Sequence, residues 1–298
     1  MTSRPISVAF HIGAHKTATS HLQRSLKRAR EAMSAQGVQY YGPDHFRVPG
    51  QSIQALFGSG LEAGIEDAKK RAAAQMKALC KDGHRLVMSE ENFIGPLNQR
   101  HGLAMKQRYT LAGDRLAELS NAIGQDIDVF LAIRRPAAFI NSAYCQMLLG
   151  GRVQPVEVFQ KRNPLGSVDW IDMVTRLRAA PGVGRVTVWQ YEDYGALFAQ
   201  IMSALIGPDA AQLVTPRPRY INRGLSTAAV AHVLAQEGDA GGTKAAIAAR
   251  NMLPVEEGHP AFDGFAPEEH EIGDAAYARQ IRLIAQMQGV TLLRPDAG

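Results

Sequence analysis

Residues 11–20 of this 298-residue chain read His11-Ile12-Gly13-Ala14-His15-Lys16-Thr17-Ala18-Thr19-Ser20. An apolar run typical of a β-strand, residues 6–10, precedes this stretch, and a helical pattern, residues 22–33, follows it. The N–H groups at a helix N-terminus favour an anion, and a lysine beside them adds a full positive charge. The first 30 residues contain no Asp or Glu that would oppose that charge. The stretch therefore predicts a strand–turn–helix unit that binds a phosphate-like anion.

The turn differs from the common nucleotide-binding loop. That loop requires the pattern Gly-x-x-x-x-Gly-Lys-[Ser/Thr]. Here His15 precedes Lys16, and Phe10 stands where the first glycine belongs. Because both glycines are missing, we expect the turn to be too short to wrap a β-phosphate as kinase and GTPase loops do.

The stretch resembles instead the 5′-phosphosulfate loop of the sulfotransferase family, Gly-x-x-Lys-[Thr/Ser]-Gly-[Thr/Ser]-[Thr/Ser]. Ala18 replaces the usual glycine, which raises the question whether its backbone takes a positive φ or stays helical. The competing interpretation is an ordinary strand-to-helix turn with an exposed lysine. The resemblance implies that the turn binds the donor 3′-phosphoadenosine-5′-phosphosulfate (PAPS), with Lys16 at the bridging oxygen. The donor-binding residues would be Gly13, Ala14, His15, Lys16, Thr17, Ala18, Thr19 and Ser20.

A second segment strengthens the resemblance. Residues 126–133 are mostly apolar, as expected for a parallel strand covered on both faces. Arg134 follows and offers a planar donor fork to a phosphate, and Ser142 lies two helical turns further on. Sulfotransferases carry a 3′-phosphate site of the form strand–Arg-x-Pro–x₅–Ser-x-Tyr. The matching residues are Arg134, Pro136, Ser142 and Tyr144. The alternative is a solvated basic pair, Arg134 and Arg135, at a helix start, where positive charge is mildly unfavourable.

Two later segments resemble the family less closely. Strand-like residues 186–190 end in Tyr191-Glu192-Asp193, and Tyr191 is a candidate for the adenine pocket or, equally, a buried core residue. A basic loop at residues 217–226 lacks the family's Arg-Lys-Gly signature. By resemblance, its Arg219 or Arg223 would close over the 3′-phosphate. Ser226 is placed to cap the helix that follows.

The acceptor must lose a proton during transfer, so a general base should lie within hydrogen-bond reach of it. Glu90 and Glu91 follow a predicted strand, residues 85–88, and strand ends face the ligand crevice in this class of fold. The resemblance selects Glu91 as the base over Glu90. Otherwise one of the two carboxylates caps the following turn and the other is solvated. His45 and His15 are the alternative bases.

The composition fits a globular protein, with 46% hydrophobic and 20% charged residues. A net charge of +5 suits a polyanionic ligand, while the chain lacks the zinc-ligand spacing and the aromatic-rich basic runs of nucleic-acid binders. Cys80 and Cys145 form no Cys-x-x-Cys pair and are expected to be buried thiols. With no apolar span of 18 residues, we expect no integral membrane segment and a cytoplasmic location.

Strand and helix patterns alternate along the chain. This alternation predicts an α/β fold with a central parallel β-sheet flanked by helices in one domain, residues 1–298. The resemblance implies the P-loop NTPase-like sulfotransferase fold. Residues 38–59 read as a loop, and residues 238–267 read as a lid or a surface insertion. A last helix is predicted over residues 267–288. Its predicted inward residues are Ile272, Ala276, Leu283 and Met287.

The sequence thus predicts a sulfotransferase that moves a sulfuryl group from PAPS to an acceptor hydroxyl or amine by in-line transfer, without a metal. The acceptor would be a small molecule or a glycan, and only the family resemblance points to a carbohydrate. Two alternatives remain. One is an atypical P-loop kinase, which should bind ATP with Mg²⁺. The other is a non-catalytic module that binds nucleotides or polyanions. No sequence feature indicates the oligomeric state.

Overall fold

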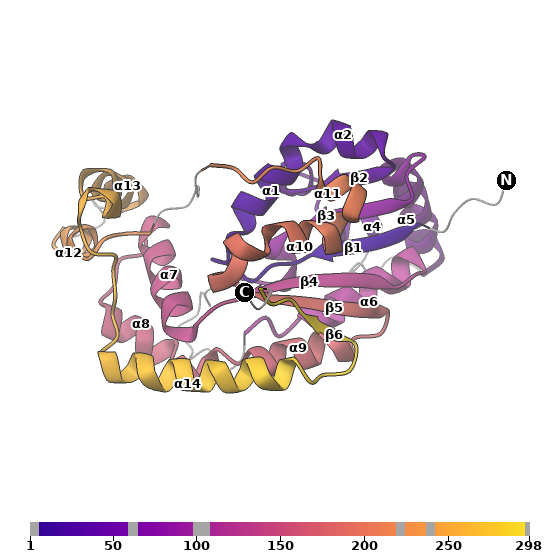
Figure 1. Cartoon of the computed structure of the whole chain (residues 1–298). Helices are drawn as coiled ribbons and strands as arrows, with labels where there is room; N and C mark the ends of the chain where they lie inside the picture. Colours follow the sequence, from indigo (N-terminus) through magenta and orange to yellow (C-terminus); the bar gives the residue numbers. More distant parts are fainter. Residues whose placement is uncertain (1–5, 59–64, 98–107, 219–223, 237–241, 296–298) are drawn as a thin grey trace.

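The computed structural model describes residues 6–58, 65–97, 108–218, 224–236 and 242–295. Within these ranges one parallel sheet of six strands runs through the molecule in the order β2-β3-β1-β4-β5-β6 (Figure 1). The prediction of an α/β fold with a central parallel sheet is confirmed. The strands are β1 (Ser7–His11), β2 (Val38–Tyr41), β3 (Arg85–Ser89), β4 (Ile127–Ile133), β5 (Val183–Gln190) and β6 (Val290–Leu292).

Helices cover both faces of the sheet. Successive residues of a strand point to opposite faces, and on β1 the neighbours Ala9 and Phe10 belong to two different buried clusters. The cluster of Ala9 includes residues of α1 (Thr19–Arg28) and α10 (Tyr194–Ile206). The cluster of Phe10 includes residues of α6 (Ala112–Ile123) and other helices. Strands buried on both faces explain the nearly continuous apolar runs of the sequence.

The remaining helices complete these layers and extend beyond the sheet. Those before β4 are α2 (Arg30–Ala35), α3 (Pro43–Phe46), α4 (Ile53–Phe57), α5 (Ile65–Cys80) and η1 (Glu91–Ile94). Those from β4 to β5 are α7 (Pro136–Leu149), α8 (Val156–Arg162), η2 (Leu165–Ser167) and α9 (Trp170–Ala179). Those after β5 are η3 (Tyr191–Asp193), α11 (Pro208–Ala211), α12 (Thr227–Leu234), α13 (Gly242–Met252), η4 (Val255–Glu257) and α14 (Pro267–Ile284).

Two segments contain more regular structure than the sequence predicted. The loop prediction for residues 38–59 is wrong, because this segment contains β2, α3 and α4. β2 pairs with β3 at the sheet edge and buries Tyr40, whose hydroxyl donates to the Gln23 carbonyl. Residues 238–267 contain α13, which contacts α7 and α12 at the side of the molecule (Figure 1).

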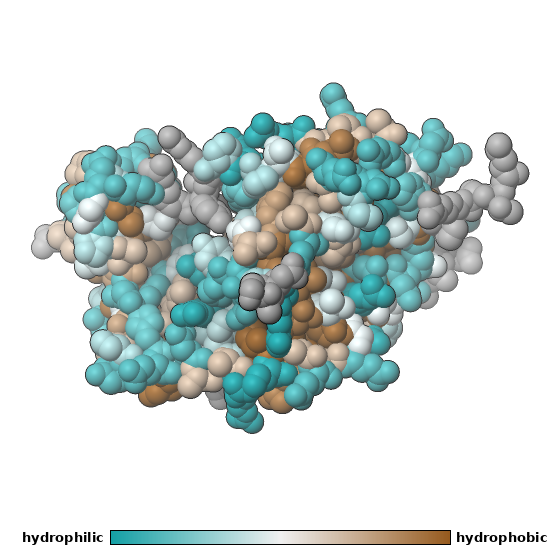
Figure 2. All heavy atoms as spheres, in the orientation of Figure 1, coloured by the Kyte–Doolittle hydropathy of each residue, from teal (hydrophilic) through white to brown (hydrophobic). Residues whose placement is uncertain are grey.

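The predicted inward face of the last helix is wrong at three of its four residues, while Met287, beyond the end of α14, is partly buried against the core. α14 ends at Ile284, and Ile272 is 69% exposed. Ala276 and Leu283 are exposed as well, while Gly273, Tyr277, Ile281 and Ile284 are buried. Tyr277 packs in the core, and its hydroxyl donates to a Glu192 carboxylate oxygen at 3.2 Å. Hydrophilic residues dominate the visible side of α14, with apolar ones scattered among them (Figure 2).

The strand order creates a crevice at the carboxyl ends of β1 and β4. These strands are hydrogen-bonded neighbours, yet the chain leaves β1 toward β2 on one side and leaves β4 toward β5 on the other. Ligands of open α/β sheets bind where connections diverge in this way. The turn at residues 12–18 follows β1, and Arg134 follows β4, so both anion-binding patterns of the sequence lie at this crevice.

The turn after β1 has three residues with positive φ. Gly13 has φ 42°, and a Cβ there would approach the Thr19 hydroxyl to 2.9 Å. Lys16 has φ 65° and Ala18 has φ 62° with ψ 16°. The open question about Ala18 is thereby answered: it is the N-cap of α1 and is left-handed, as the family's glycine would readily be. Such a conformation costs an alanine about 1–2 kcal/mol.

We expect Ala18→Gly to raise the free energy of unfolding by about 0.5–1 kcal/mol, since glycine adopts positive φ without a Cβ clash. The matched control is Ala29→Gly, at the C-cap of the same helix with φ −95°. This control should destabilise the protein by about 0.5–1 kcal/mol. Urea unfolding of both variants provides the measurement, and an equal loss of stability in both would contradict the left-handed turn.

Candidate functional site

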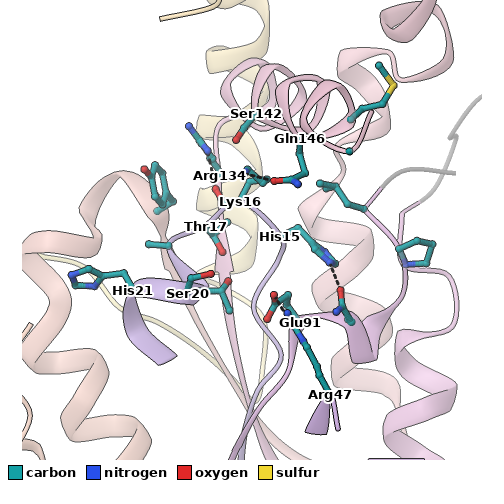
Figure 3. A pocket seen from close by; sticks show the side chains of 18 of the residues that line it. His15, Lys16, Thr17, Ser20, His21, Arg47, Glu91, Arg134, Ser142 and Gln146 are labelled. Carbon is teal, nitrogen blue, oxygen red and sulfur yellow. Dashed lines mark hydrogen bonds and ion pairs between the residues drawn. The ribbon is translucent and has the colours of Figure 1, made fainter. Parts of the chain in front are cut away.

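A cavity of about 670 Å³ opens at the carboxyl ends of the central strands. One wall is the turn and the start of α1, residues 15–21, and another is formed by Glu91 and Asn92 after β3. Arg134 after β4 and the helix α7 complete the enclosure (Figure 3). The cavity therefore draws its residues from segments that are distant in the sequence.

The cavity is strongly cationic. Of the described residues that line it, Lys16, Arg47, Arg134 and Arg152 carry positive charge, and Glu91 is the one carboxylate. The N-terminus of α1 adds to the positive electrostatic potential of the cavity, because its first turn has no acidic residue and its N-cap makes no side-chain hydrogen bond. Like charges gathered in one hollow repel one another, so this composition indicates an anionic ligand.

Lys16 reaches across the cavity to α7. Its Nζ donates to Gln146 Oε1 at 3.1 Å (Figure 3). Burial lowers the pKa of Lys16; the nearby Cys145 thiol acts in the opposite direction, and the charge of Arg134 lowers the pKa further. A partly desolvated ammonium that donates to a neutral amide gains strongly from a bound anion. Gln146 was missed by the sequence argument, although it lies four residues after Ser142 on the same helix face.

Arg134 joins the two sequence patterns. Its Nη1 donates to the Lys16 carbonyl at 2.8 Å, and its guanidinium lies 4.4 Å from the centre of the Tyr191 ring. The Trp170 indole N–H donates to the Arg134 carbonyl at 2.8 Å. Burial lowers the pKa of Arg134. Its Nε is buried without a hydrogen-bond partner in the described part of the chain. An orphaned donor on a fixed guanidinium is suited to a phosphate oxygen.

Ser142 and Tyr191 both line the cavity near Arg134. Ser142 projects from α7 toward Arg134 in Figure 3. Tyr191 begins the short helix η3 and is half-buried at the cavity wall, so the core interpretation does not hold for it. Tyr144 instead is fully buried, and its hydroxyl donates to the Gln154 carbonyl. The tyrosine of the second pattern is thus a packing residue of α7.

Glu91 is the carboxylate that faces the cavity. Its Oε1 accepts from Arg47 Nη2 at 2.7 Å, and its Oε2 accepts from Gln23 Nε2 at 2.9 Å. Burial alone would raise the pKa of Glu91, but the Arg47 charge and these hydrogen bonds outweigh it and hold the pKa below its usual value. Glu91 is therefore ionised at neutral pH and able to accept a proton.

Glu90 is turned away from the cavity. It is buried and accepts from the Asn92 N–H at 3.0 Å, which caps η1. Its two oxygens also accept from Arg47, at 2.9 Å from Nε and 2.8 Å from Nη2. This is the capping role that the sequence argument allowed for one of the two glutamates.

The structure separates the two histidine candidates. His15 lines the cavity, and its ring lies between Tyr109, whose hydroxyl is 3.0 Å from Nδ1, and Asn92, whose Oδ1 is 3.1 Å from Nε2. Burial lowers the pKa of His15 and favours the neutral ring. His45 does not line the cavity, because its ring packs against Tyr41 and Phe46. Tyr109 is a further residue that the sequence argument missed.

The other predicted positions either do not line the cavity or lie outside the described residues. Gly13 and Ala14 are buried and shape the turn without lining the cavity. Arg219 and Arg223 lie outside the described residues. Ser226 caps α12 by accepting from the Ala229 N–H. Both cysteines are buried thiols. Within the described ranges no group of three or more potential side-chain ligands surrounds a metal position, and no helix combines the length and apolarity needed to cross a bilayer.

No protein-family model matches the chain, and no curated protein matches its sequence. Its structure is similar to a sulfotransferase from Alicyclobacillus acidocaldarius, with 14% identity, a TM-score of 0.47 and 94% of each chain covered. It is also similar to retinol dehydratase in complex with androsterone and inactive cofactor PAP, with 11% identity and a TM-score of 0.35. That similarity covers 99% of this chain and 85% of the other.

Proposed function

We propose that this chain is a sulfotransferase that moves a sulfuryl group from PAPS to an acceptor hydroxyl or amine. The observation that carries the proposal is the meeting of two anion-binding elements in one cavity. The turn with Lys16 forms one element, Arg134 and Ser142 form the other, and the hydrogen bond from Arg134 to the Lys16 carbonyl joins them. Two adjacent anion sites fit a nucleotide that carries phosphate at both its 5′ and 3′ positions.

The residues of each element suit one end of the donor. The N-terminus of α1 and the Lys16 ammonium would bind the 5′-phosphosulfate. The free Nε–H of Arg134 and the hydroxyl of Ser142 would bind the 3′-phosphate. Tyr191, already stacked on Arg134, supplies an aromatic surface for the base. These assignments use the polar groups that line the cavity.

Transfer itself needs charge stabilisation and a base. PAPS supplies the sulfuryl group, and negative charge grows on the phosphate oxygen that it leaves. Lys16 and the α1 N–H groups are fixed where they can stabilise that charge. On the opposite side Glu91 is ionised and can accept the proton of the acceptor. His45 has no such role in this proposal, because it lies outside the cavity.

The polar groups of the cavity lining suggest the chemical class of the acceptor. Asn92, the neighbour of Glu91, and Gln146 and Arg152 elsewhere in the cavity lining offer amide and guanidinium groups. Such groups pair with hydroxyls, so we propose a polyhydroxyl acceptor such as a carbohydrate. Pro96, Leu97 and Met147 provide apolar surface beside them.

We expect adenosine 3′,5′-bisphosphate to raise the thermal midpoint of unfolding more than adenosine 5′-monophosphate or Mg²⁺–ATP does. Arg134→Ala should weaken the binding of adenosine 3′,5′-bisphosphate by roughly tenfold or more, since a charge-assisted hydrogen bond contributes about 1.5–3 kcal/mol. Exposed Arg185 on β5 provides the matched control as Arg185→Ala. Absence of bisphosphate binding would reject the proposal, and a preference for Mg²⁺–ATP would favour the kinase alternative.

We expect Lys16→Met to reduce transfer from radiolabelled PAPS to a glycan panel by about 10²–10³-fold, because charge at the leaving oxygen loses its stabiliser. Glu91→Gln should also reduce transfer while leaving bisphosphate binding intact. Lys161→Met, on the exposed side of α8, is the matched control. A chain that binds the bisphosphate yet transfers no label to any acceptor is a binding module.

A further inference from the structure

Arg47 lies between two carboxylates and contacts both. Its Nη2 is 2.7 Å from Glu91 Oε1 and 2.8 Å from Glu90 Oε1, and its Nε is 2.9 Å from Glu90 Oε2. Arg47 is the C-cap of α3 and so approaches the glutamates from outside the strand that carries them. One guanidinium with two ionised carboxylates gives the cluster a net charge of −1.

The two carboxylates of this cluster are not equivalent. The Glu90 side chain is 8% exposed, accepts from both Nε and Nη2 of Arg47, and caps η1. The Glu91 side chain is 13% exposed, shares one Nη2 with Glu90 and lines the cavity. The Arg47 charge is therefore compensated by Glu90 whatever Glu91 does. If Glu91 gains a proton, a neutral Arg47–Glu90 pair remains and no buried cation is left without a counterion.

A hydrogen-bond chain fixes the second oxygen of Glu91. Gln23 Nε2 donates to Glu91 Oε2 and also lies 3.1 Å from Ser89 Oγ, which in turn is 2.8 Å from His11 Nδ1. Gln23 belongs to α1, the helix whose N-terminus forms the anion site. The chain thus sets the position of the Glu91 carboxylate relative to that site.

The other titratable groups around Glu91 are uncharged near neutral pH. His11 on β1 and His15 on the turn both have their pKa lowered by burial, that of His11 to about 4. Burial raises the pKa of Tyr40 on β2 and of Tyr109 before α6. Among these neighbours, Arg47 and Glu90 are consequently the groups whose charges act on the Glu91 carboxylate near neutral pH.

We propose that Arg47 and Glu90 are positioning residues that together set the proton affinity of Glu91. Arg47 keeps the carboxylate ionised and oriented toward the cavity, and Glu90 neutralises Arg47 so that Glu91 can still take a proton. In the transfer step the acceptor O–H or N–H proton moves to Glu91 as the new bond to sulfur forms. The old sulfur–oxygen bond breaks, and its electron pair stays on the phosphate oxygen. This role rests on the proposed function, but the charge cluster itself can be measured without any substrate.

The test is an NMR titration of isotope-labelled glutamate carboxyl carbons in the full chain, with Glu91→Gln to assign the resonance. The wild-type midpoint should lie below that of an ordinary glutamate. Arg47→Met should raise it by about one pH unit or more, because the opposite charge is lost and the Glu90 charge remains. Arg47→Lys, which keeps the charge, should leave it low. Adding Glu90→Gln to Arg47→Met should lower the midpoint again.

An unchanged midpoint in Arg47→Met would overturn the role of Arg47, and a midpoint in the double variant equal to that of Arg47→Met would overturn the role of Glu90. Near-UV circular dichroism checks that each variant is folded. Arg47→Gln, which keeps a polar side chain but no charge, tests the same shift if Arg47→Met does not fold. His11 is followed by its ring resonances, since its protonation falls in the same pH range.

The outcome is independent of nucleotide binding. The expected order is a Glu91 midpoint that is low in the wild type and in Arg47→Lys, high in Arg47→Met and lower again in the double variant. If this order of midpoints appears but adenosine 3′,5′-bisphosphate does not bind, the proposed function is rejected and the inferred roles of Arg47 and Glu90 are retained. If the bisphosphate binds and the order of midpoints does not appear, only the present inference fails. Where transfer is measurable, the acidic limb of the kcat/KM profile should move upward in Arg47→Met in parallel with the Glu91 midpoint.

Discussion

The hydrogen bond from Arg134 Nη1 to the Lys16 carbonyl is the interaction on which the cavity depends. It connects the loops that follow two adjacent strands, and it is made to a residue whose backbone is left-handed. Stacking on Tyr191 and the indole bond from Trp170 immobilise Arg134 in turn. A guanidinium held by the Lys16 carbonyl and the Tyr191 ring can orient one donor edge toward a ligand while the other edge shapes the turn, and the Trp170 bond fixes the Arg134 backbone. The two elements proposed to bind anions are therefore one mechanical unit.

This unit also concentrates like charges, which has an energetic consequence. Burial lowers the pKa of both Lys16 and Arg134, and the Arg134 charge lowers the pKa of Lys16 further. Such a cavity lowers the stability of the empty protein and is relieved by an anion. The only carboxylate among its described lining residues, Glu91, is already engaged by Arg47. Relief must therefore come mainly from a ligand.

Sequence reasoning succeeded where spacing along one segment determines the geometry. Lys16 and Arg134 follow strands whose apolar runs are long, and a parallel sheet brings such strand ends together. The left-handed Ala18 could not be predicted, because alanine favours helix and only the surrounding packing imposes positive φ. Arg47 and Gln23 belong to no motif, since their roles come from tertiary contacts with Glu91. Ile272 shows the same limit: its apolar side chain suggested the core, but packing placed its neighbours inward.

The position of β1 within the sheet has a consequence for how the chain is made. β1 pairs with β3 and β4, so Val8 must wait until its partners Leu86 and Ile127 have been synthesised. At about 5–20 residues per second, the interval before β4 emerges is on the order of 10 s. Until β3 emerges both edges of β1 lack their partners, and the edge that pairs with β4 stays open for the whole interval, a state that invites association with other chains. A ligand of the cavity can therefore stabilise the finished sheet, but it cannot guide the folding of its first strand.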